Sequence, residues 1–111
     1  MKTRIEHDSM GEIDVPVDAL YGAQTQRAVD NFPVSGRSMP LPFIRGLVQI
    51  KRVAALANRD LELLPLPLAQ AIEKACDELL DDPRLMQNFP IDVYQTGSGT
   101  SSNMNANEVI A

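Results

Sequence analysis

A run of small polar residues offers the clearest chemistry in this sequence. It reads Gln95-Thr-Gly-Ser-Gly-Thr-Ser-Ser-Asn-Met-Asn-Ala-Asn-Glu-Val-Ile-Ala111. Gly97 and Gly99 tolerate backbone angles closed to other residues, which allows a sharp turn and a close approach of a ligand to the main chain. A helix that starts near residues 101–105 would point its unpaired N–H groups and its positive dipole end at this loop. Such a helix terminus can bind a carboxylate or a phosphate.

A loop that only caps a helix and binds no ligand is the competing interpretation. Asn105 and Glu108 have the spacing of a capping box, and glycine-rich motifs often occur without a ligand. A nucleotide is disfavoured as the anion, because Thr100 follows Gly99 where a phosphate-binding loop has lysine. Ser102 likewise stands where the dinucleotide fingerprint has its third glycine. A small carboxylate, held by neutral donors, fits the run better.

The composition narrows the remaining classes of protein. The length of 111 residues predicts one domain or part of one, and the net charge of −5 argues against a nucleic-acid or anionic-membrane surface. Cys76 is the only cysteine, so no internal disulfide is possible, and we expect it to be a small buried residue. No signal peptide or membrane-length apolar run is visible, which predicts a soluble, cytoplasmic protein. One histidine and one cysteine are too few ligands for a metal site.

The elements that would position the loop are mostly helical. Alternating residues at 3–6 and 12–15, around a turn at 8–11, predict a small hairpin. Asp18 is the expected cap of a helix that Pro33 stops, and its expected apolar positions are Tyr21, Thr25, Ala28 and Phe32. Residues 91–94 form a strand-like run that leads into the glycine loop.

Two longer helices are expected between the proline-rich loop at 32–42 and the acidic stop at 81–83. The first has an apolar stripe that we expect to face the core, formed by Phe43, Leu47, Ile50, Ala54, Ala57 and Leu61. Its charges Lys51, Arg52 and Arg59 are then expected to be solvated. The second starts at Pro67, with a stripe formed by Leu68, Ile72, Ala75 and Leu79. The short connection predicts an antiparallel helical pair.

Groups that could transfer protons are scarce. His7 is the only histidine and is expected in the hairpin turn, where a solvated residue is the default interpretation. The acidic pairs at 77–78 and 81–82 are typical of a helix surface and a helix end. The sequence therefore predicts an anion-binding loop without an evident general base.

Two long motifs resemble one family. Residues 93–111 are similar to the first signature region of class II fumarate hydratases, in the fumarase/aspartase superfamily. Residues 4–11, 21–28 and 89–90 resemble the same enzymes, in the same order and at the family's spacing. Aspartate ammonia-lyases share the Asn-Met-Asn-x-Asn-Glu segment but usually carry Gly and Ala where this chain has Thr96 and Ser98. The resemblance therefore favours a hydratase over an ammonia-lyase.

The resemblance implies a fold and an activity. It implies a mainly α fold with a small β component, with an N-terminal lyase domain at residues 1–100 and the start of a long central bundle helix at 101–111. It implies the reversible hydration of fumarate to L-malate in the tricarboxylic acid cycle, without a cofactor. Members of the family are homotetramers whose active sites draw residues from three subunits. The small dicarboxylate and the other subunits are then the expected partners.

Transferred residue by residue, the resemblance assigns a substrate-binding site. Ser98, Gly99 and Thr100 are the expected substrate-binding residues, and Thr96, Asn103 and Asn105 the expected supporting ones. No catalytic residue is expected within residues 1–111, because the family's catalytic groups lie further along the chain, and the isolated chain is expected to be inactive. Two alternative functions remain: an aspartate ammonia-lyase, and a non-catalytic structural or assembly module.

Overall fold

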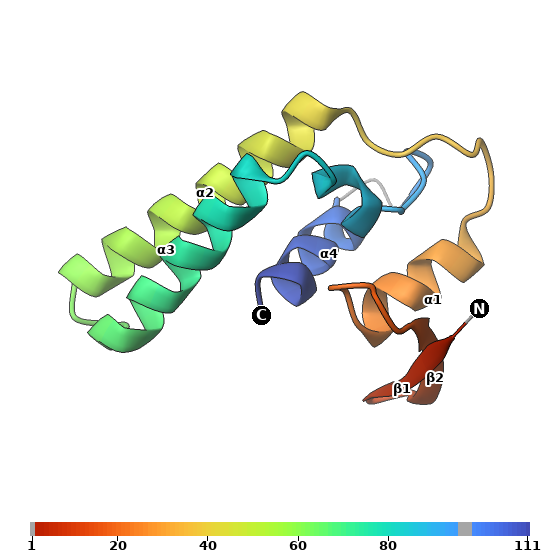
Figure 1. The fold of residues 1–111 in the computed structure, drawn as a ribbon, viewed down its shortest axis with the longest axis horizontal. Coiled ribbons are helices and arrows are strands. Elements are labelled where there is room, and N and C mark those ends of the chain that lie inside the picture. Colours follow the sequence, from red (N-terminus) through yellow and green to blue (C-terminus); the bar gives the residue numbers. More distant parts are fainter. Residues whose placement is uncertain (1, 96–98) are drawn as a thin grey trace.

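The protein is mainly helical, with one β-hairpin at its N-terminal end (Figure 1). The computed structural model describes residues 2–95 and 99–111. In chain order the elements are β1 (Thr3–Asp8), β2 (Gly11–Pro16), α1 (Ala23–Asn31), α2 (Leu41–Asp60), α3 (Leu66–Asp81), the 3-10 helix η1 (Leu85–Asn88) and α4 (Thr100–Ile110). The expected fold class, a helical pair with a short hairpin, is confirmed.

The hairpin forms where the alternating pattern predicts it. β1 pairs antiparallel with β2, and Asp8 and Gly11 close the ladder around a two-residue turn. Gly11 has a φ of 115°, a conformation that favours glycine. His7 lies within β1, opposite Glu12, and not in the turn as expected. Arg27 of α1 holds the hairpin end through two hydrogen bonds to the Asp8 carboxylate, at 2.8 and 3.0 Å.

The segment after β2 is held by one guanidinium group. Arg4 donates to the carbonyl oxygens of Pro16 and Ala19, both at 2.8 Å, and of Tyr21 at 2.7 Å. The chain enters α1 from this segment with Gly22 as the N-cap. The expectation that Asp18 caps the helix is therefore wrong, because the Arg4 contacts keep residues 16–21 out of helical geometry. The helix ends at Asn31, before Pro33, as expected.

Helices α2 and α3 form the expected antiparallel pair. Both have a proline at the first turn, where its missing N–H and fixed φ suit a helix start. Arg52 of α2 bridges to α3 by ion pairs with Glu73 at 2.9 Å and Asp77 at 2.8 Å. The expectation that Arg52 is merely solvated is therefore wrong.

The expected core face of α2 is also wrong. Its buried residues are Ile44, Val48 and Ala55, whereas Phe43, Ile50 and Leu61 of the expected stripe are 46%, 65% and 68% exposed. The observed face is displaced by one residue, about 100° around a helix of 3.6 residues per turn. On α3, Leu79 is buried as expected, but Leu68 of the expected stripe is 55% exposed. Ala69 and Cys76 are the other buried residues of this helix.

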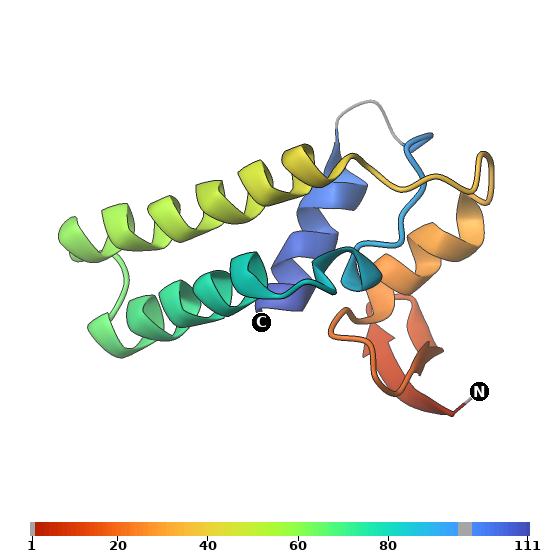
Figure 2. The same ribbon diagram turned by 45° about the horizontal axis from the view of Figure 1, so that its top comes forward.

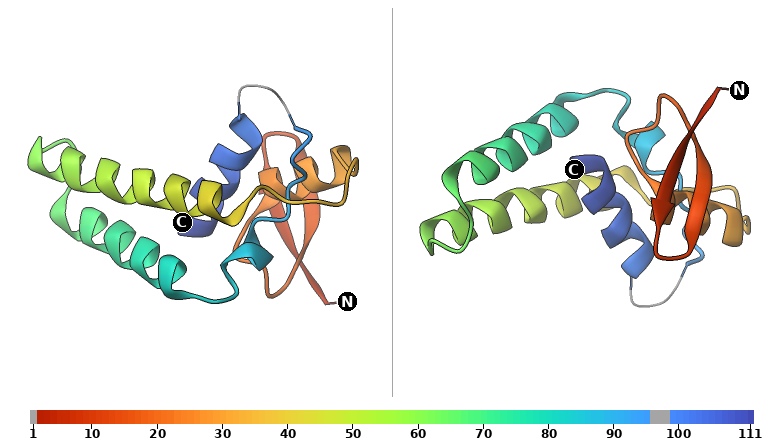
Figure 3. Two further views of the ribbon diagram at one scale, coloured as in Figure 1. Left: turned by 90° about the horizontal axis from the view of Figure 1, so that it is seen from above. Right: turned by 90° about the horizontal axis from the view of Figure 1, so that it is seen from below.

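Helix α4 lies between the α2–α3 pair and the unit formed by α1 and the hairpin, as all four views of the ribbon agree (Figures 1, 2 and 3). One core cluster joins these elements and contains Val15, Tyr21, Ile44, Val48, Cys76, Leu79, Leu85, Phe89, Ala106 and Val109. Because α4 contacts α1, α2 and α3, its position is fixed relative to these three helices. No helix within residues 2–95 and 99–111 is long and apolar enough to cross a bilayer.

Candidate functional site

The start of α4 is the centre of the candidate site. Gly99 is the N-cap and has a left-handed conformation, with φ 78° and ψ 10°. Its carbonyl oxygen accepts the first helical hydrogen bond from the N–H of Asn103 at 3.1 Å. The left-handed glycine turns the chain sharply into the helix, as the sequence predicts. Thr100 is the exposed first residue of α4, whereas Thr96 and Ser98 lie outside the described residues.

The side chain of Gln95 joins the two ends of the glycine loop. Its Oε1 atom accepts hydrogen bonds from the N–H and the hydroxyl of Ser102, both at 3.0 Å. Its Nε2 atom donates to the carbonyl oxygen of Asp92, also at 3.0 Å. Ser102 is buried, so these contacts are shielded from water. Gln95 therefore fixes the chain before the loop to the first turn of the helix after it.

Asp92 holds the chain on its approach to the loop. Its carboxylate accepts hydrogen bonds from the N–H groups of Ser35, Gly36 and Tyr94 at 2.7, 2.9 and 2.8 Å, and from the Ser35 hydroxyl at 2.9 Å. An isolated bridge between Ser38 and Asp92 replaces the strand expected at 91–94. Figure 2 shows the segment before α2, which contains Ser38, beside the segment that contains Asp92.

These donors change the acidity of Asp92. The hydrogen bond from the Tyr94 N–H, with further contributions from Ser35 and Gly36, lowers the pKa of the Asp92 carboxyl to about 2, against the opposing effect of burial. Asp92 therefore stays ionised at neutral pH with its oxygen atoms already occupied. It serves as an anchor for the loop and is unsuited to act as a general base.

An Asp92→Asn variant is expected to be less stable at neutral pH and less sensitive to acid. Because the folded-state pKa is lowered, the unfolded chain binds more protons as the pH falls, so this contribution to stability is complete above about pH 4 and is lost toward about pH 2. Urea unfolding across that range would show a steeper pH dependence for the wild type. The exposed Asp14→Asn is the matched control, and equal slopes for wild type and Asp92→Asn would contradict the anchoring role.

The two supporting asparagines make different contacts. Asn105 is buried, and its amide donates to the carbonyl oxygen of Asn88 at 2.8 Å. Asn88 in turn accepts a hydrogen bond from the N–H of Leu20 at 2.9 Å. Asn103 instead accepts a hydrogen bond on its Oδ1 atom from Lys51 of α2, at 2.5 Å. Asn105 therefore connects α4 to η1, whereas Asn103 binds the ammonium group of Lys51 near the first turn of α4.

Glu108 connects α4 to the start of α1. Its carboxylate accepts hydrogen bonds from the N–H groups of Gly22, Gln24 and Thr25 at 3.2, 3.0 and 2.8 Å, and from the Thr25 hydroxyl at 2.6 Å. It thus caps α1 from a distant part of the sequence. The expected capping box of Asn105 and Glu108 is wrong, because Asn105 lies inside α4 and Glu108 reaches a different helix. The two long sequence motifs meet at this contact.

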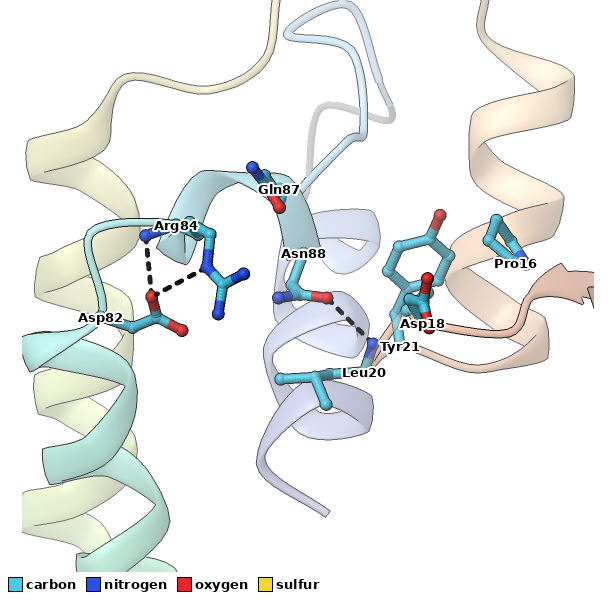
Figure 4. A pocket seen from close by; sticks show the side chains of 9 residues that line it. Pro16, Asp18, Leu20, Tyr21, Asp82, Arg84, Gln87 and Asn88 are labelled. Atoms are coloured by element: carbon cyan, nitrogen blue, oxygen red, sulfur yellow. Dashed lines mark hydrogen bonds and ion pairs between the residues drawn. The ribbon is translucent and has the colours of Figure 1, made fainter. Parts of the chain in front are cut away.

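A separate cleft of about 540 Å³ lies between the segment after β2 and η1 (Figure 4). Two contacts cross its lining: the Leu20 N–H donates to Asn88 at 2.9 Å, and Arg84 lies 3.8 Å from Asp82. Asp18 and Asp82 give it two carboxylates against one guanidinium. This balance does not favour an anion, so the cleft is a weaker candidate than the start of α4.

Two further sequence expectations concern metals and the thiol. Among the residues that the structure describes, no group of three or more His, Cys, Asp or Glu side chains could hold a metal ion. Cys76 is buried, as expected, and burial raises the pKa of its thiol. A thiol of this kind is poorly suited to react as a nucleophile.

Comparison with known proteins identifies the family. The family model described as lyase matches residues 11–111, and the chain therefore belongs to the lyase family. Class II fumarate hydratase 2 of Pseudomonas aeruginosa is 62% identical over 109 residues, which are 98% of this chain and 24% of that protein. The aspartate ammonia-lyase of Corynebacterium glutamicum is 55% identical over 112 residues, which are 99% of this chain and 21% of that protein.

A solved structure agrees with these matches. Class II fumarase from Schistosoma mansoni superimposes with a TM-score of 0.92 at 44% sequence identity, over 98% of this chain and 23% of that one. The resemblance to class II fumarate hydratases inferred from the motifs is therefore confirmed. The chain spans about a quarter of the length of the relatives that it matches.

Proposed function

We propose that the complete protein containing this chain is a fumarate hydratase that interconverts fumarate and L-malate. The 62% identity to a class II fumarate hydratase supports this activity. The observation that carries it here is the left-handed Gly99 at the start of α4, with hydroxyl and amide side chains around it. These donors suit a carboxylate, because the helix dipole and the N–H groups of the first turn favour negative charge.

Within that enzyme, residues 95–111 provide one wall of a shared active site. Ser98, Gly99 and Thr100 contact a carboxylate group of the substrate, and Thr96, Asn103 and Asn105 support them. Donors in this position stabilise the negative charge that develops on the carboxylate when the C3 proton of malate is removed. Residues 1–111 contribute no catalytic acid or base, and the isolated chain is inactive.

The proposal extends to the assembly. Residues 1–100 form an N-terminal domain, residues 101–111 begin a central bundle helix, and the complete protein is a cytoplasmic homotetramer. Large apolar side chains exposed on α2, such as Phe43, Ile50 and Val53, support burial against further parts of such an assembly. A single, buried cysteine supports a reducing compartment.

An aspartate ammonia-lyase is the second candidate, favoured by the 55% identical relative. The purified complete protein should be assayed for hydration of fumarate and for release of ammonia from aspartate. Hydration without ammonia release supports the hydratase, and the reverse result selects the ammonia-lyase. If neither occurs, the structural or assembly role gains support. The mass of the isolated chain in solution and its binding of fumarate would then test that role.

Replacing Thr100 by alanine in the complete enzyme is expected to lower kcat/KM for fumarate about fivefold, since one neutral hydrogen bond contributes about 1 kcal/mol. Steady-state kinetics in both directions measures this effect. Thr3→Ala removes the same hydroxyl and methyl from an exposed position in β1 and should leave kcat/KM unchanged. If Thr100→Ala matches the wild type, Thr100 does not belong to the site.

A further inference from the structure

Lys51 carries a positive charge to the candidate site from a distant helix. It lies on the inner face of α2, between the buried residues Val48 and Ala55. Its Nζ atom donates to Oδ1 of Asn103 at 2.5 Å, although the two residues are 52 positions apart in the sequence. Lys51 also borders an apolar cleft of about 400 Å³ lined by α2, α3 and α4. Its ammonium group is therefore directed to the first turn of α4.

The contact fixes the orientation of the Asn103 amide. An ammonium group has three donors and no acceptor, so only the oxygen of the amide can face it. The Nδ2 group of Asn103, which has two donors, must then point away from Lys51. Asn103 lies three positions after Thr100, so both side chains lie on one face of α4 and lean toward its N-terminus. Lys51 thus directs amide donors along the face on which Thr100 lies.

The location of this charge is unfavourable without an anion. The N-terminus of a helix carries a partial positive charge, so a cation nearby is repelled unless negative charge is also present. The chain as a whole has a net charge of −5, so any attraction for an anion at this site must come from local groups such as Lys51. A dicarboxylate bound at Gly99 and Thr100 would supply the missing negative charge.

We propose that Lys51 is a positioning residue for the carboxylate site: it orients the Asn103 amide toward the bound dicarboxylate and adds favourable charge. This inference rests on the proposed carboxylate-binding function of the loop. The alternative is that Lys51 and Asn103 only connect α2 to α4. The two roles differ in their effects, because a structural link changes stability, whereas a positioning residue changes affinity for the dicarboxylate.

The test uses the complete lyase and succinate, an unreactive four-carbon dicarboxylate, as the probe. Lys51→Met keeps the length of the side chain but removes its charge and donors, and it is expected to raise the Kd of succinate and the KM of fumarate about tenfold, with a smaller change in kcat. Lys51→Arg, which retains a cationic donor, should recover most of the affinity. Lys74→Met, at an exposed position on α3, is the matched control and should leave both constants unchanged.

A double-mutant cycle tests the connection through Asn103. In an Asn103→Ala background, Lys51→Met should raise the Kd of succinate by less than about threefold, because the amide that it orients is gone. Equal effects in both backgrounds would overturn the orientation argument. If Lys51→Met has a lower Tm but an unchanged Kd for succinate, Lys51 only connects α2 to α4 and the proposed positioning role is wrong. If Lys51→Met does not fold, Lys51→Gln is subjected to the same measurements.

The succinate measurement separates this inference from the proposed reaction. A wild-type protein that binds succinate but does not hydrate fumarate would contradict the hydratase function, while the Kd values still decide the role of Lys51. A wild type that hydrates fumarate, with Lys51→Met unaltered in KM and Kd, would overturn the inference alone. A wild type that neither binds succinate nor hydrates fumarate would overturn both.

Discussion

Replacing Glu108 by alanine is expected to lower the free energy of unfolding by about 2–3 kcal/mol. The wild-type carboxylate accepts four hydrogen bonds at the start of α1, including the N–H and the hydroxyl of Thr25, which is 1% exposed. Alanine would leave those donors without their acceptor and remove a negative charge from the positive end of a helix dipole. Urea unfolding followed by far-ultraviolet circular dichroism measures the loss. The exposed Glu78→Ala on α3 is the control and should change stability by less than about 0.5 kcal/mol.

A pair of glycine substitutions tests the same junction from the other side. A Cβ atom at Gly22 would lie 2.9 Å from the Glu108 carboxylate, so Gly22→Ala should displace that carboxylate and destabilise the protein. Gly46 lies within α2, and a Cβ atom there meets nothing within 4 Å in the part of the chain that the structure describes, so Gly46→Ala should stabilise the helix by about 0.5–1 kcal/mol. Equal stabilisation by both substitutions would show that the Glu108 contact does not hold α1 in place.

The hairpin and the helical pair were predictable from the sequence because their signals are local. Turn residues between two alternating segments predict β1 and β2, and prolines mark the starts of α2 and α3. The buried face of α2 was not predictable in the same way. This helix carries apolar residues on two adjacent faces, and the periodicity is the same for both. The positions of α3 and α4 decide that Ile44 and Val48 are buried and that Ile50 is exposed.

In the candidate site, too, the local features were predictable from the sequence and the long-range contacts were not. The glycine turn and the start of α4 follow from residues that are adjacent in the sequence, so they could be predicted. Asp92, Glu108 and Lys51 contact residues that lie 57, 83 and 52 positions away, and no spacing rule links such partners. An aspartate within the apolar run 91–94 was the one available sign that a buried carboxylate would need several donors.

A Gly99→Ala variant of the complete enzyme is expected to lower kcat/KM for fumarate about a hundredfold, while its cost in stability is only about 1 kcal/mol. Gly99 has a φ of 78°, and a Cβ atom there meets no described residue within 4 Å, so the expected cost comes from backbone strain. Relaxing that strain rotates the peptide groups at the start of α4. Several donors to the carboxylate then move together, whereas Thr100→Ala removes only one of them.

Gly11 provides the control for backbone strain alone. It has a φ of 115° and equally open surroundings, but it lies in the hairpin turn. Gly11→Ala should therefore lower the Tm by an amount comparable to Gly99→Ala or greater, without changing kcat/KM. Urea unfolding and steady-state kinetics on both variants separate the two effects. If Gly99→Ala is destabilised but fully active, the left-handed turn only caps α4, and the carboxylate must bind elsewhere. A large loss of activity at Gly99 alone requires that the conformation of this residue, and not merely the stability of the helix after it, sets the geometry of the site.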